Sequence, residues 1–150
     1  MIKAKRTYKS KNLEIFIPDN EHAIDLPLLD TGLSAGFPSP AEDYIEMKLD
    51  LNKELIKNPS STFLGKVNGN SMMGAGIFDG DILVIDKSLE PKNDAVLVCF
   101  IDGEFTIKKV TVIGSDMYLM PENPDFKPIK INRESDFRMW GVVTFSIHKM

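Results

Sequence analysis

The sequence predicts a mainly β fold of curled antiparallel sheet, with a few short helices and a flexible N-terminal arm. From residue 62 onward, short apolar segments alternate with turns that contain Gly and Pro. No segment carries a long helical period. One Asp-Gly pair, Asp102-Gly103, separates two such segments in the manner of a tight hairpin turn. With 150 residues, the chain is long enough for one domain with a substantial core.

Residues 1–35 are interpreted as an arm rather than a domain, because they mix charges, turn formers and short apolar pieces. Within them, Leu13–Ile17 alternates and is expected to add to a sheet edge as a strand. Five basic and no acidic side chains lie in residues 1–12, which are expected to form a solvated, mobile tail. Residues 36–150 are expected to form the core domain.

Two short helices are predicted after the arm. Ser39-Pro40-Ala41-Glu42 has the form of a capping box, although alternation over residues 44–49 keeps any helix there short. Asp50 is expected to cap a second helix, Leu51–Lys57, which ends before Asn58-Pro59.

Seven strands are predicted after residue 62. They are Phe63–Val67, Asp81–Asp86, Ala95–Ile101, Glu104–Ile113, Met117–Met120, Ile129–Ile131 and Trp140–His148. A two-residue turn at Asp102-Gly103 would pair Leu97 with Lys108. Lys108 and Lys109 would then point to opposite faces, so one of them is expected in low-dielectric surroundings.

The charge distribution argues against direct sequence-specific DNA binding. All 22 acidic side chains lie beyond the basic leader, so the rest of the chain is net acidic, whereas DNA binding requires positive charge. The single cysteine, Cys99, lies in an apolar run and is expected to fill the core. No Cys/His cluster suits a metal, no cofactor is expected, and no membrane span or secretory signal is found. These features predict a cytoplasmic protein.

Ser71 is the candidate nucleophile. It lies in the Gly-rich stretch "NGNSMMGAG", where exposed main-chain N–H groups are suited to hold an oxyanion. His22 and His148 lie near the chain ends and are expected at the surface, so a neutral lysine is the alternative base, and Lys108 is the candidate. Taken alone, the two residues fit a turn serine and a solvated strand lysine better than a catalytic pair. Asp79 and Asp81 in "FDGD" are interpreted as turn residues.

Longer motifs carry a specific resemblance. They are "GFPSPAEDYIEMKLDLNKELIKNPSSTFLGKVNGNSM", "IFDGDILVID", "DGEFTIKK" and "WGVV". In order, spacing and wording they resemble the UmuD-like branch of the LexA-like family of self-cleaving serine peptidases, over the chain from about residue 36 to the end. The other branches fit less well, because residues 1–35 show no helix-turn-helix pattern and no membrane anchor is seen. The leader 1–12 has no clear match to the family.

The resemblance implies a Ser-Lys dyad and a self-cleavage site. Ser71 matches the family's nucleophile and Lys108 its base, and Ala35-Gly36 stands where family members cut their own chain. The backbone N–H groups of Ser71 and Met72 would hold the oxyanion. A tethered substrate has a high effective concentration, so cleavage needs little binding energy.

The resemblance also implies partners and a pathway. A homodimer would be stimulated by a RecA filament on single-stranded DNA, and residues 1–35 would be removed. The shortened product would serve a UmuC-like Y-family DNA polymerase in error-prone translesion synthesis, a DNA-damage (SOS) function. The alternatives are a non-catalytic LexA-like module that regulates a polymerase, and a peptidase that cleaves other proteins.

Overall fold

The computed structural model describes eight segments, residues 4–9, 13–18, 25–29, 46–70, 72–101, 103–120, 127–132 and 137–150. The chain divides into two compact units. The first consists of Met1–Asp19 together with Asn58–Met150, and the second of Asn20–Lys57. They are taken in turn.

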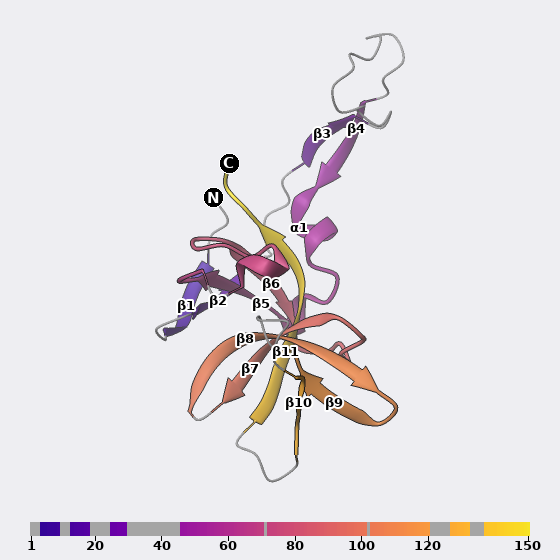
Figure 1. Ribbon diagram of the computed structural model, residues 1–150. Helices are drawn as coiled ribbons and strands as arrows, with labels where there is room; N and C mark the ends of the chain where they lie inside the picture. The colour runs from indigo at the N-terminus through magenta and orange to yellow at the C-terminus, as the bar shows by residue number, and fades with distance from the viewer. Residues whose placement is uncertain are drawn as a thin grey trace. The chain divides into compact units, whose positions relative to one another are not determined.

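The first unit is built on one sheet of nine strands (Figure 1). Its strands are β1 (Ala4–Lys9), β2 (Leu13–Pro18), β5 (Thr62–Val67), β6 (Ile82–Asp86), β7 (Ala95–Ile101), β8 (Glu104–Ile113), β9 (Asp116–Leu119), β10 (Ile129–Lys130) and β11 (Phe137–Ile147). All neighbouring strands are antiparallel, in the order β1-β2-β5-β6-β11-β7-β8-β9-β10. Because this order is linear, the sheet is open rather than a closed barrel. The predicted mainly β class is confirmed, as is each of the seven strands predicted after residue 62.

Strand β11 joins the two halves of this sheet. Its first part, Phe137 to Val142, pairs with β7, and its last part, Val142 to Ile147, pairs with β6. The register shifts once in each ladder, which is the mark of β-bulges that bend a strand. Figure 1 shows β11 in yellow, running from beside β7 to beside β6. The chain's last strand therefore reaches the loop that precedes β6.

The β7–β8 hairpin has the predicted register. Ile101 pairs with Glu104, and Leu97 pairs with Lys108. Gly103 has φ +83°, a left-handed conformation that glycine adopts without strain. Since successive side chains alternate between faces, Lys108 and Lys109 lie on opposite faces of the hairpin.

The leader differs from the predicted solvated tail. Residues 4–9 form β1, the edge strand of the sheet, with Lys5 and Lys9 exposed. The Lys9 ammonium lies 3.9 Å from the Glu14 carboxylate of β2. The strand predicted at Leu13–Ile17 is confirmed, since β2 pairs with β5. The predicted boundary between residues 35 and 36 lies outside the described residues and stays a prediction.

The second unit contains a hairpin and a short helix. Strand β3 (Asp25–Leu29) pairs with β4 (Glu46–Asp50), which leads into α1 (Leu51–Leu55). The predicted cap is confirmed, because the Asp50 carboxylate accepts a hydrogen bond from the Asn52 amide at 3.0 Å. The helix ends two residues before the predicted Lys57, and the predicted capping box at residues 39–42 lies outside the described residues.

Two clusters of buried side chains form the core of the first unit. The larger contains Leu13, Ile15, Val67, Met72, Ile77, Leu83, Ile85, Val98 and Ile107. The smaller contains Leu97, Cys99 and Val110, which confirms Cys99 as a core residue. Leu97 and Val98 are successive residues of β7 and belong to different clusters. The clusters therefore lie on opposite faces of this strand.

Candidate active site

Lys108 lies half-buried on the apolar face of β8 that carries the smaller cluster. Leu97 stands directly opposite it on β7, and both Leu97 and its neighbour on that face, Cys99, are fully buried. Burial raises the pKa of the Cys99 thiol to about 12, and the positive charge of Lys108 opposes part of that rise. The predicted base therefore shares its surroundings with fully buried side chains.

The 68–81 loop, defined as the segment between β5 and β6, carries the position of the predicted nucleophile. Two backbone hydrogen bonds close its stem: the Val67 amide donates to the Asp81 carbonyl, and the Gly80 amide donates to the Val67 carbonyl, both at 2.9 Å. Gly80 has φ +84°, as a left-handed turn position requires. The turn predicted at Asp79-Gly80 is thus confirmed.

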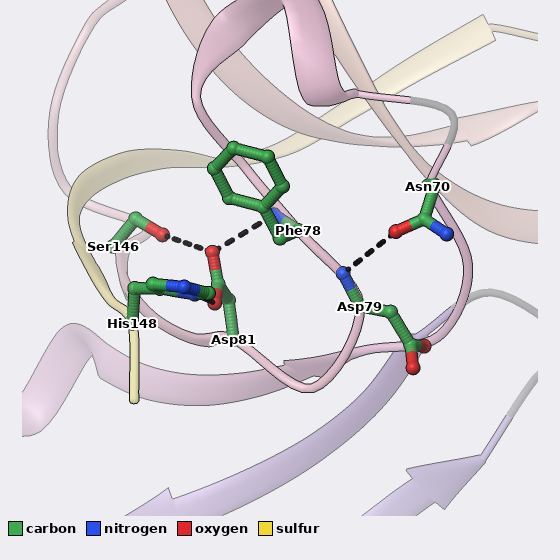
Figure 2. Close-up of polar contacts among 6 residues, drawn as sticks. All are labelled: Asn70, Phe78, Asp79, Asp81, Ser146 and His148. Carbon is green, nitrogen blue, oxygen red and sulfur yellow. Dashed lines mark hydrogen bonds and ion pairs between the residues drawn. The ribbon is translucent and has the colours of Figure 1, made fainter. Parts of the chain in front are cut away.

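Asp79 holds the segment that leads to position 71. Its Oδ1 accepts a hydrogen bond from the Gly69 amide at 2.7 Å, and its own amide donates to Asn70 Oδ1 at 3.2 Å. Figure 2 shows the second of these bonds, with the Asn70 side chain turned toward the Asp79 backbone. The residue immediately before Ser71 is therefore held across the loop.

Met72 fixes the other side of position 71. Its side chain is 6% exposed and packs in the larger core cluster. Its carbonyl accepts a hydrogen bond from the Ile77 amide at 3.1 Å. The same cluster contains Ile107, the residue before Lys108. Met72 and Ile107 therefore share one core cluster, whereas the side chain of Lys108 lies on the other face of β8, with the smaller cluster.

Asp81 ends the loop and is 1% exposed. Its carboxylate accepts hydrogen bonds from the Phe78 amide at 2.8 Å and the Ser146 hydroxyl at 3.2 Å, and its Oδ1 lies 2.6 Å from His148 Nδ1 (Figure 2). Burial alone would raise the pKa of this carboxyl. The bonds from Phe78, His148 and Ser146 outweigh burial and hold the pKa below its ordinary value of 3.8.

Sequence reasoning missed this connection. His148 was expected at the surface, and its side chain is indeed 49% exposed, yet its ring nitrogen reaches a buried carboxylate. Its ring also lies 5.1 Å from that of Phe78, between centroids. Asp81 was interpreted as a turn residue at the start of a predicted strand, with no buried contact expected of it. Its place directly before the apolar run Ile82–Ile85 was the available signal that it enters the core.

The predicted site residues are only partly described. Lys108 and Met72 have the surroundings given above. Ser71, Ala35 and Gly36 lie outside the described residues, so the Ser71–Lys108 pair and the cleavage bond stay predictions. Within the described segments, no group of three or more His, Cys, Asp or Glu side chains could hold a metal ion. No helix in these segments is long and apolar enough to cross a membrane.

Comparison with known proteins decides the family. The model of the Peptidase S24-like family matches residues 27–144. The chain belongs to this family. The chain is 40% identical to Protein MucA of Salmonella typhimurium over 116 residues, which are 77% of this chain and 79% of MucA. It is 36% identical to Protein ImpA of Escherichia coli over 138 residues, 88% of this chain and 90% of ImpA.

A third relative agrees. Protein SamA of Salmonella typhimurium is 38% identical over 123 residues, 82% of this chain and 85% of SamA. This S24-like chain therefore matches UmuD-like relatives over most of its own length and most of theirs, and the resemblance noted in the sequence is confirmed. Family membership therefore shows that the chain is of a peptidase kind.

Proposed function

We propose that this S24-like chain is an SOS-response autopeptidase that cuts its own Ala35-Gly36 bond with Ser71 and Lys108. Family membership supports the peptidase class, and the half-buried Lys108 on a β8 face with buried neighbours supports its role as base. The placement of Lys108 is the observation that carries the proposal, because a lysine acts as a base only as the neutral amine, and partial burial disfavours the charged form.

In the proposed reaction, the neutral Lys108 amine takes the proton from the Ser71 hydroxyl, and Ser71 Oγ attacks the carbonyl carbon of Ala35. The backbone N–H groups of Ser71 and Met72 stabilise the oxyanion of the tetrahedral intermediate. Lys108 then returns the proton to the departing Gly36 nitrogen, which leaves an ester between Ala35 and Ser71. Water hydrolyses that ester, so the products are residues 1–35 and residues 36–150.

We propose that a stimulating partner raises the fraction of chains whose N-terminal arm, residues 1–35, is bound at the active site, and that it does not change the reaction itself. Contact with a RecA filament on single-stranded DNA would favour the conformer in which Ala35-Gly36 lies beside Ser71. The chain would act as a homodimer in the cytoplasm. Its shortened form would bind a UmuC-like Y-family polymerase and enable translesion synthesis. The UmuD-like relatives support this assignment.

The test is self-cleavage of the purified full chain across a range of alkaline pH, followed by mass spectrometry. Cleavage is expected to create a new N-terminus at Gly36, and to speed up as pH rises, because more of the amine is neutral. Ser71→Ala and Lys108→Ala should stay whole. Lys109→Ala is the matched control: it removes a neighbouring lysine on the opposite face and should cleave like the wild type.

Two outcomes would reject the proposal. A wild-type chain that stays whole, even with an activated RecA filament, would favour the alternative of a non-catalytic module that regulates a polymerase. Cleavage of added proteins but not of the Ala35-Gly36 bond would favour a peptidase acting in trans.

A further inference from the structure

Asp79 makes two hydrogen bonds across the 68–81 loop that are not needed to close the loop. The stem is already closed by the two backbone bonds at Val67, and Asp81 anchors the loop end in the core. Asp79 itself is exposed, yet its carboxylate accepts a hydrogen bond from the Gly69 amide instead of only facing solvent. Together with its amide bond to Asn70, it makes a reciprocal contact beyond the stem.

This contact falls at one of the glycines of the loop. Gly69 has φ +94° and no atom within 4 Å of where a Cβ would lie, so neither packing nor a side chain restricts its backbone. Past position 71, in contrast, Met72 is held in the core. Asp79 therefore supplies the restraint on one side of position 71, and burial supplies it on the other.

We infer that Asp79 is a positioning residue for the Ser71 nucleophile. By binding the Gly69 amide and the Asn70 side chain, it sets the direction in which the backbone enters position 71. A nucleophile displaced by about 1 Å loses on the order of a hundredfold in rate, so this restraint acts on catalysis more than on the fold. The inference rests on the proposed function of Ser71.

The experiment compares self-cleavage rates, pH profiles and thermal unfolding midpoints of full-length variants. Asp79→Ala removes the acceptor, and Asp79→Asn keeps an acceptor oxygen without the charge. Asn70→Ala removes the partner that receives the Asp79 amide. Glu90→Ala is the control, because it removes an exposed carboxylate elsewhere on the first unit.

Asp79→Ala is expected to cleave about tenfold more slowly at every pH, with the shape of the pH profile unchanged. Asp79→Asn should restore the rate to within about threefold of the wild type, since the acceptor remains. Asn70→Ala should also slow cleavage, and the two variants together should cost less than the sum of their separate costs, because their two bonds restrain the same segment before position 71. Unfolding midpoints should stay within a few degrees of the wild type, and Glu90→Ala should behave as the wild type.

The inference is overturned if Asp79→Ala cleaves at the wild-type rate, or if Asp79→Asn is as slow as Asp79→Ala. If Asp79→Ala fails to fold, Asp79→Asn still decides, because a rate more than about threefold below the wild type there overturns the inference. A wild-type rate in Asn70→Ala overturns the part that the bond to Asn70 plays in it. A wild-type chain that never cleaves overturns the proposed function and this inference with it. Fast cleavage by both the wild type and Asp79→Ala overturns the inference alone.

Discussion

His148 Nδ1 lies 2.6 Å from Asp81 Oδ1, although the two residues are 67 positions apart in the chain. The contact joins the segment after β11 to the end of the loop in which Ser71 occurs. It exists because β11 leaves β7 and continues along β6, so its last residues pass beside the residue that precedes β6. A buried carboxylate lies at each end of β6. Asp81 precedes the strand and takes part in this contact, and Asp86 is the last residue of the strand.

Loss of stability in acid is expected from these two carboxylates. Burial would raise the pKa of Asp86, but hydrogen bonds from Asn58, Ser88 and Ser61 outweigh it, so its pKa, like that of Asp81, lies below 3.8. An unfolded carboxyl returns to its ordinary value. Their stabilising contribution is thus fully present above that value and is lost as pH falls through the lower folded values.

The measurement is the urea midpoint followed from about pH 7 down to about pH 2.5. The midpoint should fall in the acidic part of this range. The fall should be smaller in Asp81→Asn and Asp86→Asn, which cannot titrate there. An acid dependence that is equally steep in both variants would contradict the prediction.

Removal of the His148 ring should destabilise the chain. His148→Ala deletes one of three groups that contact the Asp81 carboxylate, and a hydrogen bond to a charged group contributes about 1.5–3 kcal/mol when buried. Because the ring is half-exposed and water can replace it, a loss of about 1 kcal/mol is expected. Urea unfolding near neutral pH measures it. Lys149→Ala, next along the chain, serves as control, and an equal effect there would argue against a specific contact.

Substitution of Gly65 or Gly141 by alanine should destabilise the fold, because each glycine lies close to a different atom of Ile85. A Cβ on Gly65 would lie 2.9 Å from Ile85 Cδ1, and one on Gly141 would lie 2.7 Å from Ile85 Cγ2. Each change to alanine is expected to cost about 1–3 kcal/mol through overpacking. Gly74→Ala is the control, because a Cβ there meets no atom within 4 Å.

The second mutation is Ile85→Val, which deletes Cδ1 and keeps a methyl group at the Cγ2 position. It should relieve part of the cost of Gly65→Ala and none of the cost of Gly141→Ala. The readout is a double-mutant cycle from urea unfolding. If Ile85→Val brings no relief to Gly65→Ala, the close approach of Ile85 Cδ1 is not the cause of its cost.

Cys99 should be inert to alkylation in the folded chain. Its thiol is fully buried and its pKa is about 12, so almost no thiolate is present near pH 8. Iodoacetamide followed by mass spectrometry should show labelling only after denaturation. Because the Lys108 charge holds the thiol pKa down, Lys108→Met should raise it further and leave labelling of the folded chain undetectable. Rapid labelling of the native protein would contradict this account.

The parts of the fold that sequence predicted are those governed by local rules. The β7–β8 register is the one predicted from Asp102-Gly103 in the sequence, and the Asp50 side chain caps α1. The edge strand β1 was missed because its charges suggest solvent, and an edge strand tolerates charge. The bulges in β11 leave no clear signal in an alternating pattern, so the meeting of His148 with Asp81 was out of reach. The residues alone made Ser71 and Lys108 candidates, and the family resemblance was needed to assign them as a dyad, because a turn serine and a solvated lysine give the same local pattern.

The short connection between Ile101 and Glu104 has a consequence for how such chains can change. Substitutions along either strand leave the alternation of side chains intact. A single residue lost from the connection would shift β8 by one place against β7, so that Lys109 would stand opposite Leu97, in the surroundings of Lys108; a single residue gained would place Ile107 there. A change in the length of this connection is therefore expected to disrupt the protein more than a substitution within it. Its length decides which residue of β8 stands opposite Leu97.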